Sequence, residues 1–192
     1  MENNLQYLDS IKRLFLYYKT LAEKAIEQLE EQQLFFAANE DTNSIAIIIQ
    51  HLAGNMLSRW TDFLTTDGEK EWRNRDGEFE ENHTNKIELM AFWEKGWDCL
   101  FDAVNALQTE QLSDIVYIRK EGHTVMDAIN RQLAHYPYHI GQIVFYAKML
   151  KKTEWESLSI PKNKSNDYNA DKFSKEKSIR NFTDDELNKL QK

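Results

Sequence analysis

The stretch RQLAHYPYHIGQIVFYAKML, residues 131–150, decides the fold class of this chain. Its apolar side chains recur at steps of three and four residues, which is the spacing of one face of an α-helix. His135 and His139 are four residues apart, so both imidazoles lie on one face, about 6 Å apart along the helix axis. Pro137 lies between them, where it removes one main-chain hydrogen bond and kinks the helix. We predict a long, bent amphipathic helix over residues 125–151.

Three other segments have the same helical spacing of apolar residues: residues 5–35, 44–66 and 85–107. The second of these has Asn43 or Ser44 as its N-cap and ends before Asp67-Gly68. In the third, Asn85 followed by Glu88 resembles a capping box. Together with the histidine-bearing helix, these segments predict an all-α fold, a four-helix bundle with a long crossover connection.

The connections between these helices have different patterns. Residues 67–82 are polar, contain two glycines and predict a long loop. Residues 113–124 alternate around Gly122 and predict an extended turn or a short hairpin, before Thr124 and Asp127 cap the last long helix.

The composition changes after Ile160-Pro161 to a polar stretch with few aliphatic residues. We therefore predict one helical bundle domain over residues 1–165 and a polar C-terminal tail over residues 166–192, extended on the surface. Thr183 opens a further capping box, which predicts a short helix near residues 183–191 at the end of the tail.

Charge and composition exclude several classes of function. The chain has 192 residues, 41% of them hydrophobic and 29% charged, with a formal net charge of −8. Such a charge repels nucleic acid and anionic lipid, and the short basic runs at 73–75 and 162–164 are flanked by acidic residues. We expect a small-molecule substrate, with no nucleic-acid or membrane partner.

Nothing in the sequence indicates export or membrane insertion. No apolar run approaches the ~18 residues that span a bilayer, and the segment MENNLQYLDS has no signal-peptide pattern. Cys99 is the only cysteine, so the chain has no internal disulfide and suits a reducing compartment. We expect the protein in the cytoplasm, with Cys99 as a packing residue.

The histidine pair in residues 131–150 can hold one metal ion, since imidazoles four residues apart converge on one side of a helix. The zinc-protease motif needs a glutamate directly after the first histidine, and here that residue is Tyr136, so a metalloprotease is excluded. A catalytic metal also needs a third ligand from another element. The candidates are His51, His83 and His123.

His51 differs from the other two candidates because it lies in the middle of an apolar helix, whereas His83 and His123 lie at loop ends. A line of polar residues accompanies it along the helix, including Asn55 and Arg59. A similar polar line accompanies the histidine pair on the other helix. If the two lines face each other, the buried groups either satisfy one another or surround an ion.

Four quoted stretches resemble the DinB/YfiT-like superfamily of bacterial four-helix proteins, in particular its uncharacterised bacillar branch. They are HLAGNMLSRWTDFL (51–64), RNRD (73–76), GHTVMDAINRQLAHYPYHIGQIVFYAKML (122–150) and WESLSIP (155–161). The resemblance covers about residues 5–165. It joins the lone histidine of one helix, the intervening loop and the histidine pair of another.

The resemblance implies a long-crossover helical bundle, often a homodimer, with a divalent metal ion held by His51, His135 and His139. Zinc or nickel is the common metal in such proteins, and water fills the open coordination positions. Characterised relatives include S-transferases and isomerases that use bacillithiol, mycothiol or glutathione. Pro137 departs from the pattern of many members, and we expect the helix to tolerate it.

These expectations give roles to the polar residues near the histidines. Asn55, Arg59 and Gln142 are candidates for binding the thiol cofactor, as are arginines of the 73–75 run. Glu121, just before the last long helix, is the candidate catalytic residue, either orienting a ligand or accepting a proton.

Two classes of function remain open from the sequence. The first is a metal-dependent enzyme, a thiol S-transferase or a hydrolase with the same three-histidine site. The second is a non-catalytic, stress-related binding protein. An enzyme needs a coordination position open to solvent, and a structural site is closed by a fourth protein ligand.

Overall fold

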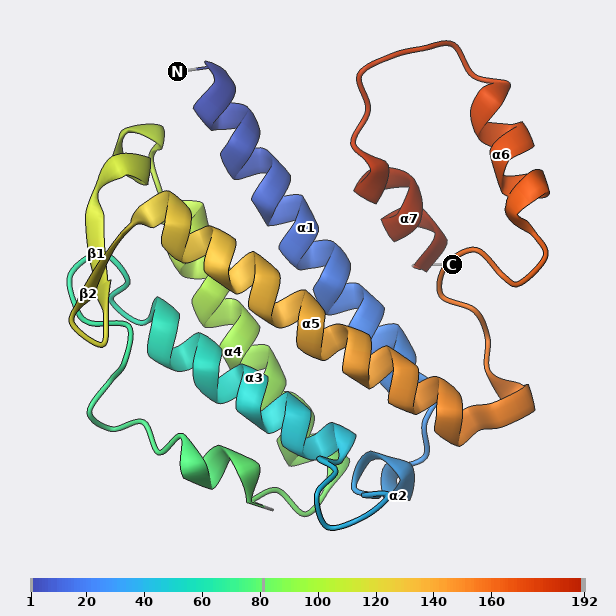
Figure 1. Ribbon diagram of the computed structural model, residues 1–192, viewed down its shortest axis with the longest axis horizontal. Coiled ribbons are helices and arrows are strands. Elements are labelled where there is room, and N and C mark those ends of the chain that lie inside the picture. Colours follow the sequence, from blue (N-terminus) through green and yellow to red (C-terminus); the bar gives the residue numbers. More distant parts are fainter. Residues whose placement is uncertain (1, 81, 191–192) are drawn as a thin grey trace.

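The computed structural model describes residues 2–80 and 82–190, and this part of the chain is mostly helical (Figure 1). Its helices are α1 (Glu2–Glu27), α2 (Glu31–Leu34), α3 (Ile45–Trp60), α4 (Lys86–Ala106), α5 (Val125–Lys151), α6 (Ser165–Phe173) and α7 (Phe182–Leu190). The remaining elements are the 3-10 turns η1 (Asp76–Phe79), η2 (Thr109–Ser113) and η3 (Lys152–Glu154) and the strands β1 (Ile115–Ile118) and β2 (Glu121–Thr124). The prediction of a helical protein is confirmed, with one small hairpin.

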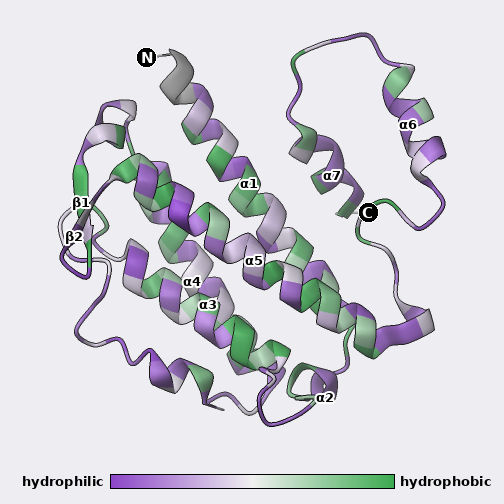
Figure 2. Cartoon of the chain, viewed as in Figure 1, coloured by the Kyte–Doolittle hydropathy of each residue, from purple (hydrophilic) through white to green (hydrophobic). Residues whose placement is uncertain are grey.

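The four long helices enclose the hydrophobic core. Helix α1 packs against α4 and α5, and α3 packs against the same two helices (Figure 1). Each of the four long helices has green hydrophobic positions between purple hydrophilic ones, whereas the loop after α3 is mainly hydrophilic (Figure 2). The largest fully buried side chains include Phe15, Trp93, Trp97 and Tyr136. Each of these aromatic rings contributes strongly to stability, because its burial removes a large apolar area from water.

The helix starts are set by side chains that replace missing main-chain acceptors. Ser44, Asn85 and Thr124 each accept the N–H three residues further along, at 2.9 to 3.2 Å. Such caps satisfy N–H groups that the first turn leaves unbonded. The predicted starts of α3, α4 and α5 are therefore confirmed.

The first predicted helix, residues 5–35, is interrupted. Helix α1 ends at Glu27, and α2 begins after Glu30, whose N–H is accepted by the Gln33 side chain at 3.0 Å. Gln28 is held across the molecule by two hydrogen bonds with the main chain of Glu156, at 2.9 and 3.1 Å. The helical spacing of apolar residues continues through the break, because a short turn returns these residues to the core. The sequence pattern alone therefore does not show the break between α1 and α2.

Helix α3 ends at Trp60, earlier than the predicted end near Thr66. Asp62 has a φ of 48°, in the left-handed region, and its carbonyl accepts the N–H groups of Thr65 and Thr66 at 3.0 Å. A left-handed residue ends an α-helix because the following N–H groups turn away from the helix axis. The first residues of the next loop are thereby folded into a tight turn.

The hairpin predicted for residues 113–124 is present, with β1 antiparallel to β2. Its turn is formed by Arg119 and Lys120, which have φ values of 56° and 66°, as a two-residue hairpin turn requires. The Asp67 carboxylate accepts both of their N–H groups, at 2.8 and 2.7 Å. The long loop between α3 and α4 is thus attached to the hairpin near the start of α5.

The C-terminal segment is more ordered than the predicted extended tail. Residues 165–173 form α6, and the predicted last helix is α7, which packs on the outer side of α1 (Figure 1). Phe182 meets the Tyr17 ring at 5.9 Å between centroids, and Arg13 pairs with Asp184. The division into a 1–165 domain and a 166–192 tail stays a prediction.

Among residues 2–80 and 82–190, every helix is too short or too polar to cross a bilayer.

Candidate metal centre

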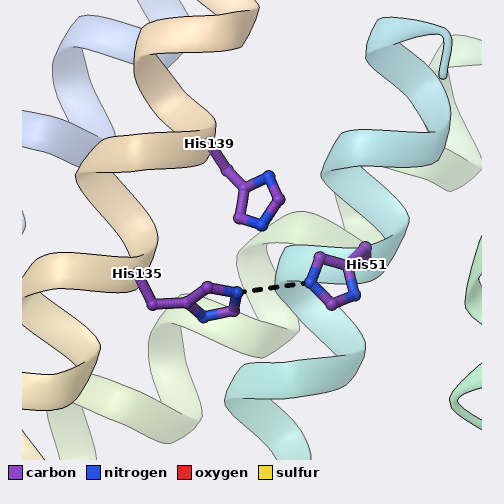
Figure 3. A group of neighbouring side chains, drawn as sticks. All are labelled: His51, His135 and His139. Carbon is purple, nitrogen blue, oxygen red and sulfur yellow. Dashed lines mark hydrogen bonds between the residues drawn. The ribbon is translucent and has the colours of Figure 1, made fainter. Parts of the chain in front are cut away.

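Three histidines from two helices lie together between α3 and α5. His51 comes from the middle of α3, and His135 and His139 come from successive turns of α5 (Figure 3). One ring nitrogen from each lies within 4.8 Å of the other two. The Nε2 atoms of His51 and His135 are 3.4 Å apart. Helix α5 continues through Pro137, so both of its histidines keep the same face.

In two of the three rings, Nδ1 has a hydrogen-bond partner that orients the ring. His51 is 4% exposed, and its Nδ1 lies 2.9 Å from Oε2 of Glu78. Nδ1 of His139 lies 2.9 Å from Oε1 of Gln142. A carboxylate or amide oxygen only accepts, so Nδ1 of each ring carries the proton and Nε2 keeps its lone pair. The ring of His51 also stacks on Phe79, with centroids 4.8 Å apart.

Glu78 reaches His51 because α3 holds the loop close to its own surface. The Gln50 amide nitrogen donates to the main-chain carbonyls of Glu78 and Glu80, at 2.9 and 2.8 Å. Gly54, one turn after Gln50, has no side chain, and a Cβ there would lie 2.7 Å from Oε1 of Glu78. A larger residue at this position would push the carboxylate away from the histidine.

The Glu78 carboxylate is ionised although it is buried. Burial alone would raise its pKa, but the hydrogen bond from His51 and the hydrogen bonds and charge of Arg73 lower the pKa below its ordinary value. Arg73 makes two parallel hydrogen bonds to it, at 2.7 and 2.9 Å. This bidentate pairing fixes both oxygens of the carboxylate.

The imidazoles of α5 are neutral at physiological pH. Burial, followed by the neighbouring His139, His51 and arginine charges, lowers the pKa of His135 to about 3. Burial also lowers the pKa of His139, although its hydrogen bond with Gln142 opposes the shift. Neutral imidazole is the form that binds a metal ion, because the ion takes the nitrogen lone pair.

The geometry of the cluster fits a cation. Two nitrogens at about 2.0–2.1 Å from a tetrahedral ion lie about 3.3 Å apart, close to the 3.4 Å between His51 and His135. Within residues 2–80 and 82–190, no further His, Cys, Asp or Glu joins the group. The three histidines can therefore hold a metal ion with a position left for another ligand, and imidazole suits zinc, nickel, copper and iron.

A cavity of about 300 Å³ opens beside the histidines. Its wall consists of three histidines, five arginines and three other side chains: His51, His135, His139, Arg59, Arg73, Arg75, Arg119, Arg131, Asn55, Phe79 and Gln132. The volume lies at the lower end of the range for small-molecule sites. A ligand in this cavity would face the histidine nitrogens on one side and guanidinium groups on the other.

The residues predicted to bind a cofactor or act in catalysis take different positions. Asn55 and Arg59 line the cavity, and Gln142 bonds to His139 from behind. Glu121 is exposed on β2 and is not among the lining residues. The carboxylate that contacts the cluster is Glu78, which the sequence analysis did not select. The functional roles of Asn55, Arg59, Gln142 and Glu121 stay predictions.

Asn55 is held with a defined orientation. The Trp60 indole N–H donates to the Tyr136 hydroxyl at 3.0 Å, and that hydroxyl donates to Oδ1 of Asn55 at 3.1 Å. Because its oxygen already accepts from Tyr136, Asn55 has its amide N–H groups available for the cavity. Burial raises the pKa of Tyr136 above its ordinary value, so the hydroxyl keeps its proton.

The two other candidate third ligands lie apart from the cluster. Nδ1 of His83 lies 2.9 Å from the Gln50 side-chain oxygen, and its ring stacks on Phe92. His123 lies on β2. Of the alternatives open in the sequence, only His51 is placed to share an ion with the pair on α5.

A second, larger cavity lies between α3 and α4, with a volume of about 920 Å³. Its wall is mostly apolar and includes Cys99, whose sulfur contacts the Thr61 hydroxyl at 3.5 Å. It holds none of the histidines. The smaller cavity is the one that contains the three histidines and the five arginines.

The comparisons with known proteins give a family without an activity. A family model described as "Protein of unknown function (DUF1572)" matches residues 2–164, which include the four long helices and all three histidines. No curated protein and no solved structure matches the chain.

Proposed function

The chain belongs to the DUF1572 family, and we propose that this member is a DinB-like metal-dependent enzyme that acts on or with a low-molecular-weight thiol, as an S-transferase. The proposal includes a zinc or nickel ion bound by His51, His135 and His139. It also includes the DinB/YfiT-like architecture, a four-helix bundle with a long crossover, and assembly into a homodimer.

The observation that carries the proposal is the convergence of three imidazoles on a point that borders an open cavity. Structural metal sites have four protein ligands, whereas catalytic sites have three and an open position. Glu78 and Gln142 fix two of the rings from outside, as the partners of metal-binding histidines commonly do. These features favour a reactive site over a purely structural one.

When bound, a divalent cation at this site would lower the pKa of a coordinated thiol or water, so that the nucleophile exists at neutral pH. The chain's own residues would orient the reactants. Asn55 would donate a hydrogen bond to a polar group of the substrate, because Tyr136 fixes its oxygen. Glu78 would keep the proton on Nδ1 of His51, so that Nε2 faces the cation. The support for a thiol as substrate is the resemblance to the DinB/YfiT-like proteins.

The test of this activity uses the purified full chain loaded with zinc or nickel. Glutathione, bacillithiol and mycothiol are each incubated with a chloronitroarene, and formation of the thioether is followed by absorbance. In this reaction a C–S bond forms, the C–Cl bond breaks, chloride leaves, and the thiol proton passes to buffer. We expect turnover with at least one thiol, lost in His51→Ala and retained in His123→Ala.

Two other outcomes would point elsewhere. Turnover of ester or amide substrates without any thiol would make the protein a hydrolase with the same site. Bound metal with no turnover of either kind would make it a non-catalytic binding protein. The homodimer is tested by light scattering, which should give twice the chain mass of 22.8 kDa.

A further inference from the structure

We propose that the cavity beside the histidines contains an anion-binding site, in which Arg131, Arg119 and Arg75 bind a carboxylate or phosphate group of the substrate. The inference rests on the proposed function, since it describes the substrate of the same cavity. It adds a chemical class to that substrate, and it assigns recognition to Arg131 and Arg119, which were not selected from the sequence, together with Arg75.

The wall of the cavity carries an excess of positive charge. Five arginines line the cavity: Arg59, Arg73, Arg75, Arg119 and Arg131. Two carboxylates, Glu69 and Glu78, pair with three of them, and the fully exposed Asp76 lies 4.0 Å from Arg75. At least two guanidinium charges are unmatched, in a chain whose formal net charge is −8. A low-dielectric cavity concentrates such a charge and attracts anions.

Two of the five arginines use their donors within the fold, and the other three do not. The Arg73 side chain is 2% exposed, and its donors go to Glu78 and Glu69. Arg59 donates to the Gly68 carbonyl and, with both terminal nitrogens, to Glu69 at 3.1 Å. Arg59 attaches the long loop to α3, and Arg73 connects two acidic residues within the loop. Removal of Arg73 would take the only arginine partner from the buried Glu78 carboxylate among the described residues.

The remaining three arginines have N–H donors that are not used by other protein groups in the described part of the chain. They are exposed at the entrance of the cavity, which we call its rim. Arg131 is exposed on α5 one turn before His135, and it makes no hydrogen bond or ion pair with the described residues. The Arg119 side chain is 53% exposed, with one nitrogen 3.2 Å from Glu69. Arg75 lies over the Phe79 ring, 5.4 Å from its centroid, with its side chain 52% exposed. They come from α5, the hairpin turn and the loop, so they surround the entrance.

The guanidinium groups of these three arginines suit an anionic ligand. A guanidinium group presents parallel N–H donors that match two oxygens of a carboxylate or phosphate, and it stays charged at any physiological pH. A substrate with such a group could bind the rim by its anionic end and place its reactive atom at the histidines. The rim would then select anionic over neutral substrates.

The experiment is isothermal titration of the metal-free full chain with inorganic phosphate and, separately, with succinate. A double variant, Arg131→Gln with Arg119→Gln, removes two rim donors and leaves the buried Arg59 and Arg73 pairs intact. The matched control is Arg180→Gln, which removes an arginine that contacts Ser178 in the C-terminal segment. We expect saturable binding in wild type and control, and binding about tenfold weaker or more in the double variant. The thermal midpoint should be similar in all three.

The outcomes separate this inference from the proposed function. Binding of phosphate but not succinate assigns a phosphate group, and the reverse assigns a carboxylate. The absence of saturable binding, or equal binding in wild type and double variant, overturns the inference even if the protein binds metal. Anion binding that appears only with metal and disappears in His51→Ala would place the anion on the cation and overturn it too. Anion binding by a protein that never binds metal would keep the rim site and reject the proposed enzyme.

Discussion

His135 and Tyr136 are consecutive residues of α5, yet they belong to two different layers of the interior. His135 faces α3 at the cavity, where Glu78 of the long loop bonds to His51 and Gln142 of α5 bonds to His139. Tyr136 points into the aromatic layer, with its ring 6.0 Å from Phe15 and 6.1 Å from Trp97. The aromatic layer is stabilised by apolar contact, whereas the histidine layer depends on charges and hydrogen bonds.

The difference between the layers shows how one helix can serve both stability and chemistry. Adjacent helical side chains point about a quarter turn apart, so a one-residue step separates a ligand from the core. The Tyr136 hydroxyl connects the layers, because it bonds to Trp60 on one side and Asn55 on the other. We expect substitutions in the aromatic layer to change stability and those in the histidine layer to change binding.

Trp97→Ala should have the largest effect on stability. The side chain is fully buried, and truncation of such a residue costs about 3–5 kcal/mol in the free energy of unfolding. Chemical denaturation measures this loss, with the exposed Trp72→Ala as the matched control, expected within about 0.5 kcal/mol of wild type. Metal content per folded chain should not change. A stable Trp97→Ala protein that loses its metal would show that the layers are not separate.

Glu78→Gln should weaken metal binding about 10–100-fold, because it removes the charge that orients and polarises His51. Competition with a chelator measures the affinity. Glu69→Gln is the control, since Glu69 pairs with the same Arg73 but contacts none of the three histidines. Equal losses in both variants would mean that Glu78 acts only through the fold of the loop.

Tyr136→Phe tests the connection between the layers. It leaves the Trp60 indole N–H and the Asn55 oxygen without their partner, which should cost about 1–2 kcal/mol. Metal affinity should stay the same, and turnover should fall because Asn55 is free to rotate. The separate variant Asn55→Asp should also have reduced turnover, since it replaces the amide donor by an acceptor. Unchanged turnover in Tyr136→Phe would contradict the role given to Asn55.

The pH dependence of the folding stability of the metal-free protein should show the smallest difference between the two layers. The pKa of His135 is about 3 in the folded protein and near 6.5 in an exposed histidine, so between these values the unfolded chain binds more protons. Folding stability should therefore fall as the pH drops from about 6.5 toward 3, and should be insensitive to this group above 6.5. Unfolding curves at several pH values should show a shallower slope in His135→Asn. An identical slope in the variant would rule out this histidine as the cause.

The sequence predicts the elements that depend on local patterns. The caps at Ser44, Asn85 and Thr124 identify three helix starts because each uses a side chain within three residues of its partner. The histidine pair follows from helical spacing, and His51 stands out as a polar residue in an apolar helix. What the periodicity could not show is where a helix stops, since Asp62 ends α3 by its backbone conformation.

The parts that escaped sequence analysis depend on contacts between distant segments. Glu78 lies in an aperiodic loop with several other acidic residues, and only its packing over Gly54 shows that it reaches His51. Helix α6 is polar, and it is held to α7 by the Tyr168–Glu186 hydrogen bond and the Lys172–Asp185 pair. Such pairings leave no periodic signal in the sequence.

The most direct test is elemental analysis of the purified protein after incubation with zinc or nickel and removal of excess ion. The account predicts stoichiometric metal in the wild type and in the matched controls His83→Ala and His123→Ala, and almost none in His51→Ala or His139→Ala. Circular dichroism confirms that each variant is folded. A metal-free wild type, or metal that persists in folded His51→Ala, would contradict a site shared between α3 and α5.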